Sequence, residues 1–154
     1  MTVIHRTGVV GRVFRYRPHH FLCTLGFQGK GYSPGFVQNF STIVGRLREK
    51  DGEQQLIEVV DVCDDICQPC PRRSKQLCQQ EKTIAVLDAG HSQVLGLQAG
   101  QRISWGEAKD LLKERMSIAD FHRVCSACSW KSLGYCEGAL RSLQSEGEIL
   151  SVEN

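Results

Sequence analysis

Long hydrophobic runs are missing from this sequence. No stretch approaches the roughly 18 apolar residues that a membrane-spanning helix needs, and arginine and glycine interrupt the first twenty residues before an apolar segment forms. We therefore expect no secretory signal and no membrane partner, and a cytoplasmic location by default. With 41% hydrophobic and 23% charged residues, the 154-residue chain has a globular composition and is long enough for one ordinary domain.

Acidic residues are missing from the first third of the chain. The first acid is Glu49, whereas the rest of the chain carries seventeen acids against twelve basic residues. The basic residues before Glu49 are Arg6, Arg12, Arg15, Arg17, Lys30, Arg46 and Arg48. Such a one-sided segment predicts an anionic partner at the N-terminal third, namely phosphate, nucleic acid or an acidic protein. The alternative is that the fold brings acids from elsewhere to these residues and disperses the charge.

Familiar catalytic motifs are also missing. The chain has no Ser–His–Asp arrangement, HExxH, Walker motif or CxxxCxxC motif of radical enzymes. Asp64 and Asp65 are candidate acid–base groups, although solvated turn residues are the more common reading of such a pair. The glycine-rich loop at residues 26–31, with Lys30, is a candidate anion cradle, but a structural tight turn explains the glycines equally simply.

The hydrophobic pattern predicts an α+β fold with more helix than strand, in a single domain with a core at 17–140 and an extension or edge strand at 1–16. Ser33 and Pro34 begin a helix whose apolar residues continue with helical spacing to Leu47. Capping patterns predict helices at 88–95, 108–116 and 118–124, and a last helix covers 137–145. Strands are expected at 9–17 and 56–62, whereas 83–87 fits either type.

Cysteine is what the sequence has in excess. Eight cysteines are far more than a cytosolic protein of this size usually carries, and a reducing compartment disfavours stable disulfides. Six of them form two triplets with the spacing C-x2-C-x7-C: Cys67, Cys70 and Cys78, then Cys125, Cys128 and Cys136. A C-x2-C pair is a compact chelate that zinc knuckles and iron–sulfur loops both use. The triplets therefore predict metal ligation.

Each triplet needs a fourth ligand, and two cysteines remain. Cys63 lies four residues before the first triplet, so it joins that site most easily, and Cys23 is left for the second. The domain would then be organised around two four-cysteine metal sites. Alternatively, one triplet has no fourth cysteine and holds an open iron, or His19 or His20 completes it. Without a metal role, one of these histidines belongs to the core and the other to the surface.

The choice of metal favours iron–sulfur clusters. Pro71 directly follows Cys70, as proline follows a ligand in bacterial ferredoxins. A zinc ribbon needs only two C-x2-C pairs and would leave four cysteines unexplained. We therefore expect one or two [4Fe–4S] clusters, with zinc as the alternative. Trp130 and Tyr135, inside the second triplet, are expected to cover its metal.

Three stretches together resemble a known family: RPHHFLCTLGFQGKGYSPGFVQNF, then DDICQPCP with its third cysteine, then CSACSW followed by GYC. They are similar to small bacterial and archaeal proteins of the domain-of-unknown-function family 1284, for which iron–sulfur binding has been suggested. The resemblance runs from about Arg17 to Leu140. It implies seven of the eight cysteines as the family pattern, without Cys63. This implies one complete cluster and one three-cysteine site, or a histidine as the eighth ligand.

Three functions fit these observations. The first is electron transfer to or from a redox protein partner, with every iron held by cysteine. The second is an enzyme whose incompletely ligated iron acts as a Lewis acid beside His19 or His20. The third is a zinc-stabilised module that contacts nucleic acid, or a protein partner, through its basic segment. Full ligation is the simplest use of eight cysteines and favours the first.

Overall fold

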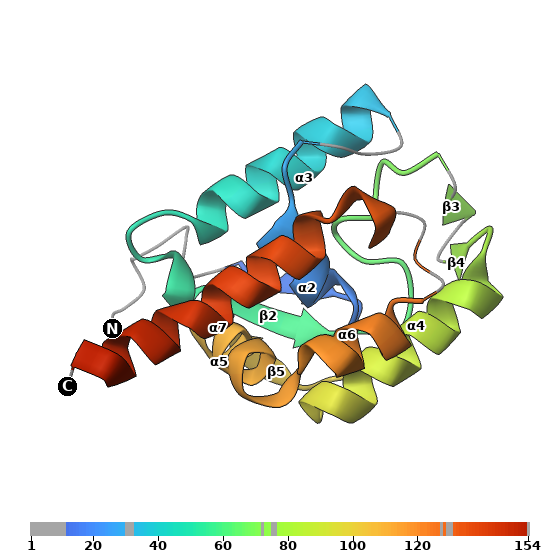
Figure 1. Ribbon diagram of the computed structural model, residues 1–154. Coiled ribbons are helices and arrows are strands. Elements are labelled where there is room, and N and C mark those ends of the chain that lie inside the picture. The colour runs from blue at the N-terminus through green and yellow to red at the C-terminus, as the bar shows by residue number, and fades with distance from the viewer. Residues whose placement is uncertain are drawn as a thin grey trace.

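Six α-helices and a small three-stranded sheet make up the described part of the chain (Figure 1). The computed structural model describes residues 12–29, 33–71, 73–74, 77–126, 128 and 131–153, with the backbone alone at 73–74, 77, 132 and 146–153. The helices are α2 (His20–Gly26), α3 (Pro34–Leu47), α4 (Glu81–Leu95), α5 (Trp105–Arg115), α6 (Ile118–Val124) and α7 (Tyr135–Glu153). The expected α+β class, with more helix than strand, is confirmed.

The sheet has the order β1-β2-β5, with β1 (Phe14–Tyr16) parallel to β2 (Leu56–Val59) and β5 (Arg102–Ser104) antiparallel to it. Residues 9–11 of the first expected strand lie outside the described part of the chain. The second expected strand ends at residue 59 rather than 62, where the chain turns toward the first cysteines. A separate hairpin pairs β3 (Arg73–Ser74) with β4 (Leu77–Cys78).

Side chains on one face of the sheet form part of the core. Phe14 and Tyr16 are buried while Arg15, between them, is exposed, as strand alternation requires. Ile57 of β2 lies opposite Ile103 of β5 on the same buried face. The hydrophobic stripe of α3 packs into the same core, so one body of apolar side chains connects the sheet and helices.

Local capping signals predicted several helices correctly. Ser33 begins α3 and accepts a hydrogen bond from the backbone N–H of Phe36 at 3.1 Å. Ser104 and Glu107 form a reciprocal capping box at the start of α5, and Ser117 forms another at the start of α6. The last helix is much longer than expected, since α7 begins two residues before 137 and continues to 153.

The prediction around Asp88 is wrong. Residues 81–95 form one continuous helix, α4, and Asp88 lies in its interior rather than at its start. The strand option at 83–87 is therefore excluded too. α4 ends at Gly96, whose φ of 72° is a left-handed conformation that glycine adopts readily.

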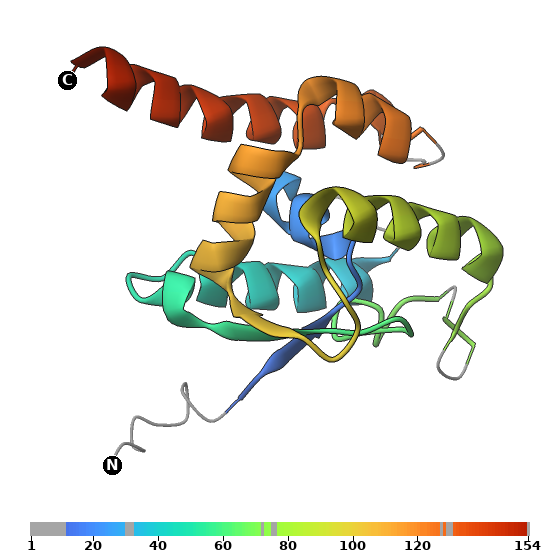
Figure 2. The same ribbon diagram turned by 90° about the horizontal axis from the view of Figure 1, so that it is seen from below.

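The sequence patterns gave no sign of α2, which lies at the centre of the molecule. Both ribbon views place it between α7 and the strands of the sheet (Figures 1 and 2). Two short 3₁₀ turns, η1 (Gly52–Gln54) and η2 (Lys131–Leu133), complete the described elements. None of the described helices is long and apolar enough to cross a membrane.

Candidate metal centre

Helix α2 brings Cys23 to the second cysteine triplet, about a hundred residues away in sequence. The Cys23 thiol is hydrogen-bonded to Cys136, at the start of α7, and the charges of Cys128 and Cys125 also act on it. Gly26 allows this approach, because a Cβ there would lie 2.8 Å from the Cα of Cys136. The structure therefore gathers four thiols from three separate segments.

These four thiols act on one another's ionisation. The hydrogen bond that the Cys23 thiol donates to Cys136, followed by burial and the neighbouring thiolate charges, raises the pKa of Cys23. Burial, and then the charges of Cys128 and Cys136, raise the pKa of Cys125 to about 12. The hydrogen bond with Cys23 lowers the pKa of Cys136. A bound metal reverses this situation, because a coordinating thiol loses its proton outright. This donor set of four soft sulfurs suits zinc or an iron–sulfur cluster.

His91 of α4 lies beside the same sulfurs, and sequence reasoning did not select it. Its Nε2 is 3.3 Å from the Sγ of Cys125, and the two side chains line a small cavity with Cys23 and Cys136. Burial, followed by the charge of His19, lowers the pKa of His91 to about 3, so the ring is neutral. No local pattern marks this histidine. Its spacing of three residues from Asp88 is the only hint that both share one helix face.

His19 is held by a buried carboxylate at the edge of this cavity. Its Nδ1 lies 2.5 Å from Oδ1 of Asp88, whose other oxygen accepts from Nε of Arg17 at 2.9 Å. Burial alone would raise the pKa of Asp88, but its hydrogen bond and charge interaction with His19 and the Arg17 charge hold it below the usual value. Burial, and then His20, lower the pKa of His19. The pair is therefore an aspartate held against an imidazole, which is how proteins often orient a metal-binding histidine.

His20 pairs in turn with Asp64. The Nδ1 of His20 is 2.6 Å from Oδ2 of Asp64, which also accepts from the backbone N–H of Arg17 at 2.5 Å. The other carboxylate oxygen accepts from the backbone N–H groups of Ile66 and Cys67. Asp64 is thus a fully hydrogen-bonded buried group, so the solvated-turn interpretation is wrong for it. The expectation of one core and one surface histidine is also wrong, since His19 and His20 are both buried.

Two cysteines of the first triplet, Cys67 and Cys70, lie at the turn that follows β2. Cys67 is near enough to Cys63 and Asp64 for both charges to raise its pKa, although burial is the largest cause. The backbone N–H of Cys70 donates to the carbonyl of Cys67 at 2.8 Å, and Cys78 lies in β4. His20, Asp64 and Cys67 each place a potential metal-binding atom within 4.8 Å of the other two. Whether Cys63 completes this site stays a prediction.

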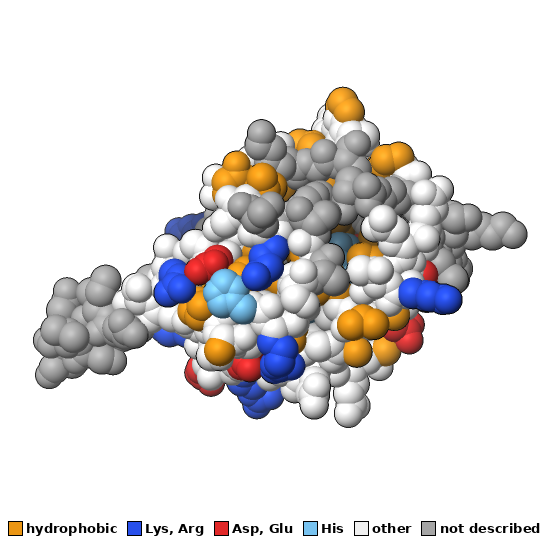
Figure 3. Space-filling model, turned by 45° about the vertical axis from the view of Figure 1, so that its right-hand side comes forward, with side chains coloured by type: hydrophobic (Ala, Val, Ile, Leu, Met, Phe, Trp, Pro, Cys, Tyr) orange, Lys and Arg blue, Asp and Glu red, His pale blue; other side chains and the backbone are white. Residues whose placement is uncertain are grey.

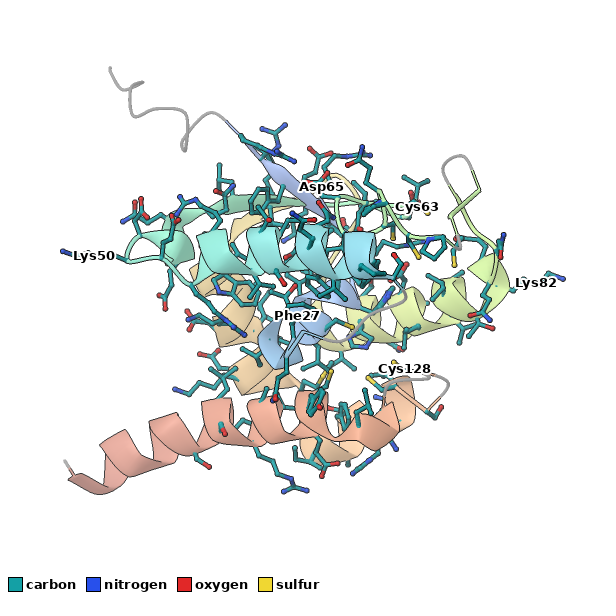
Figure 4. The ribbon with its side chains drawn as sticks, turned by 90° about the horizontal axis from the view of Figure 1, so that it is seen from above. Phe27, Lys50, Cys63, Asp65, Lys82 and Cys128 are labelled. Carbon is teal, nitrogen blue, oxygen red and sulfur yellow. The ribbon has the colours of Figure 1, made fainter. Side chains whose placement is uncertain are left out.

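The structure contains the eight cysteines as thiols rather than in disulfide bonds. Figure 4 shows Cys63 and Cys128, one from each group, on the side of the molecule away from Lys50. His19 and His20 lie at the start of α2, between the two cysteine groups. The centroids of their rings are 4.2 Å apart. Tyr135 lines a second small cavity with Cys23 and Cys136, whereas Trp130 lies outside the described residues.

Several basic residues of the N-terminal third are paired with acids from elsewhere. Arg17 binds Glu81 as well as Asp88, and Arg46 contacts Asp51 at 2.9 Å. On the face drawn in Figure 3, acidic and basic side chains lie close to each other rather than separated by sign. The glycine-rich loop has Gly29 at a φ of 86°, while Lys30 lies outside the described residues. An anionic partner for this segment stays a prediction.

The fold and the cysteines define a small, cysteine-rich α+β protein. A family model described as "Protein of unknown function (DUF1284)" matches residues 31–134, about two thirds of the chain, and the chain belongs to this family. The expected family is thus confirmed, although the matched range begins after Cys23 and ends before Cys136. No curated protein and no solved structure matches the chain.

Proposed function

We propose that this protein binds iron–sulfur clusters and transfers electrons. The second triplet with Cys23 would hold one [4Fe–4S] cluster, and the first triplet with Cys63 would hold a second one. The ligands would be Cys23, Cys125, Cys128 and Cys136 for one cluster, and Cys63, Cys67, Cys70 and Cys78 for the other. The observation that carries the proposal is the convergence of Cys23 on the second triplet through α2.

Complete ligation by cysteine supports electron transfer over substrate chemistry. Four thiolates leave no iron open to a substrate, whereas a catalytic metal keeps one coordination position free. Such a cluster supplies a one-electron couple, and the protein sets its potential through hydrogen bonds to the sulfurs and through burial. Burial of Cys125 and partial burial of the other three thiols are consistent with that role.

One observation favours a second candidate, the Lewis-acid enzyme. His19 is oriented by Asp88 and lines the cavity that Cys23, Cys125 and Cys136 also line. An imidazole oriented in this way beside an open iron would serve as an acid–base group. This alternative requires an exchangeable iron, whereas electron transfer requires reversible reduction without one.

The test is the content of iron and acid-labile sulfide after anaerobic purification, together with the visible spectrum. About eight of each per chain are expected for two [4Fe–4S] clusters. The Cys23→Ser and Cys63→Ser variants should each fall to about four of each, since each removes a ligand of a different cluster. A colourless protein with about one or two zinc ions and no sulfide would refute the proposal and favour the zinc-stabilised binding module.

A further inference from the structure

His91 has an unusual hydrogen-bonding environment. Its side chain is 1% exposed, its Nε2 contacts the Sγ of Cys125, and its Nδ1 has no partner. Within the part of the chain that the structure describes, this Nδ1 is the one buried side-chain nitrogen or oxygen without a hydrogen bond. Because such groups are rare in folded proteins, the position of the ring calls for an explanation other than packing.

A metal-bound sulfur fixes the proton of this ring. A neutral imidazole carries one N–H donor and one bare acceptor nitrogen. The thiol of Cys125 can either donate to Nε2 or accept from it, but a metal-bound thiolate can only accept. Nε2 must then carry the proton, which leaves Nδ1 as a bare acceptor. The unpartnered nitrogen is thus an acceptor rather than a donor. Buried acceptors without a partner are more common in proteins than buried donors without one.

Resting on the proposed function, we propose that the Nε2–H of His91 donates a hydrogen bond to the Cys125 sulfur and thereby raises the reduction potential of the centre held by the second triplet. One-electron reduction at this site, by a one-electron donor, adds negative charge to the ligating sulfurs and forms or breaks no bond. A donor aimed at one of those sulfurs is attracted more strongly after reduction, because hydrogen bonds to charged acceptors strengthen with the charge. The hydrogen bond therefore stabilises the reduced state of the centre. Hydrogen bonds to the ligating sulfurs tune the potentials of other iron–sulfur clusters in the same way. His91 acts through Cys125 and is a positioning residue.

The experiment is an anaerobic redox titration of the purified protein, followed by electron paramagnetic resonance, with four proteins compared. They are the wild type, His91→Leu, which removes the donor, His91→Gln, which can return an N–H to the place of Nε2, and Leu87→Ile. Leu87 lines the same cavity without a polar group, so it controls for altered packing. The centre of the first triplet lies elsewhere and provides an internal reference within each sample.

In His91→Leu, one of the two centres should become about tenfold harder to reduce at a fixed potential, which is a shift of about 59 mV for one electron. The other centre should not move, and His91→Gln should restore most of the difference. Equal potentials in the wild type and His91→Leu would overturn the inference, as would the same shift in Leu87→Ile. So would equal shifts of both centres.

If His91→Leu does not retain its centres, a measurement on the wild type tests the inference instead. Protein labelled with ¹⁵N-histidine should show a weak nitrogen coupling in the reduced state, and His91→Gln should lose it. Absence of the coupling, or a strong coupling typical of a direct nitrogen ligand, would overturn the inference. A wild type without iron and sulfide would instead refute the proposed function itself, so the two failures are distinguishable.

Discussion

A methyl group added to Gly26 tests the packing that brings Cys23 beside Cys136. Gly26 is the last residue of α2, and α7 crosses it so closely that a Cβ would lie 2.8 Å from the Cα and 2.9 Å from the backbone nitrogen of Cys136. Both atoms belong to the backbone, so no flexible side chain can move aside. The Gly26→Ala variant must therefore displace α7 or the end of α2.

The size of the effect follows from two opposing terms. Overpacking a close contact destabilises a protein by about 1–3 kcal/mol, while alanine is favoured over glycine in a helix by up to about 1 kcal/mol. Because the contacting atoms are backbone, the overpacking cost should lie near about 2–3 kcal/mol, and with a helix gain of about 1 kcal/mol the net loss expected for Gly26→Ala is about 1–2 kcal/mol. For a chain of this size, that lowers the melting temperature by about 2–8 °C.

Thermal unfolding followed by circular dichroism measures this change, with Gly45→Ala as the matched control. Gly45 lies inside α3, and a Cβ there would meet nothing within 4 Å, so that variant should gain about 0.5–1 kcal/mol. The prediction is therefore a difference in sign between two identical substitutions. A Gly26→Ala protein as stable as the wild type would refute the close approach of α2 and α7.

Three further predictions address the buried charges, the helix caps and the metal. Asp88→Asn should lose about 3 kcal/mol in chemical denaturation, because it removes one of the two carboxylates that pair with the buried Arg17 guanidinium and leaves Glu81 alone; Glu58→Gln, from a partly exposed ion pair, should lose less than about 1 kcal/mol. Ser104→Ala should lose about 1 kcal/mol through the α5 capping box, and the exposed Ser41→Ala should be nearly neutral in the same assay. An iron or zinc chelator, added anaerobically, should lower the melting temperature, since a metal bound only by the folded state stabilises it; an unchanged value would contradict metal binding.

Much of the helical structure could be predicted because its signals are local. Ser33, Ser104 and Ser117 each cap a helix through the backbone N–H three residues further on, so a few neighbouring residues carry the information. α2 lacks such a signal, because its N-cap, His19, makes no side-chain capping bond. Seven residues are too few for a helix to be stable alone, so α2 depends on packing that the sequence does not display.

Asp88 was misassigned for a related reason. An aspartate before an apolar stretch is typical of a helix start, but the same side chain also serves as a buried ion-pair partner. The choice between these roles depends on Arg17, which is 71 residues away in sequence and contacts Asp88 only in the fold. Sequence spacing assigned Cys23 to the second triplet only because Cys63 lies closer to the first. No local pattern indicated a role for His91.

The charge balance between the two cysteine groups argues further for bound cations. Asp64 and Asp88 are buried, and their hydrogen bonds and neighbouring charges hold the pKa of each below its usual value, so both stay ionised. Glu81 adds a third carboxylate; the guanidinium of Arg17 pairs with Glu81 and Asp88, whereas Asp64 accepts from the backbone N–H of Arg17. The neutral ring of His91 cannot offset them. Ionising a triplet of thiols here would place further negative charge close to these buried carboxylates. A cationic metal or cluster core at each group resolves that conflict, because it draws the thiol protons off while compensating the charge.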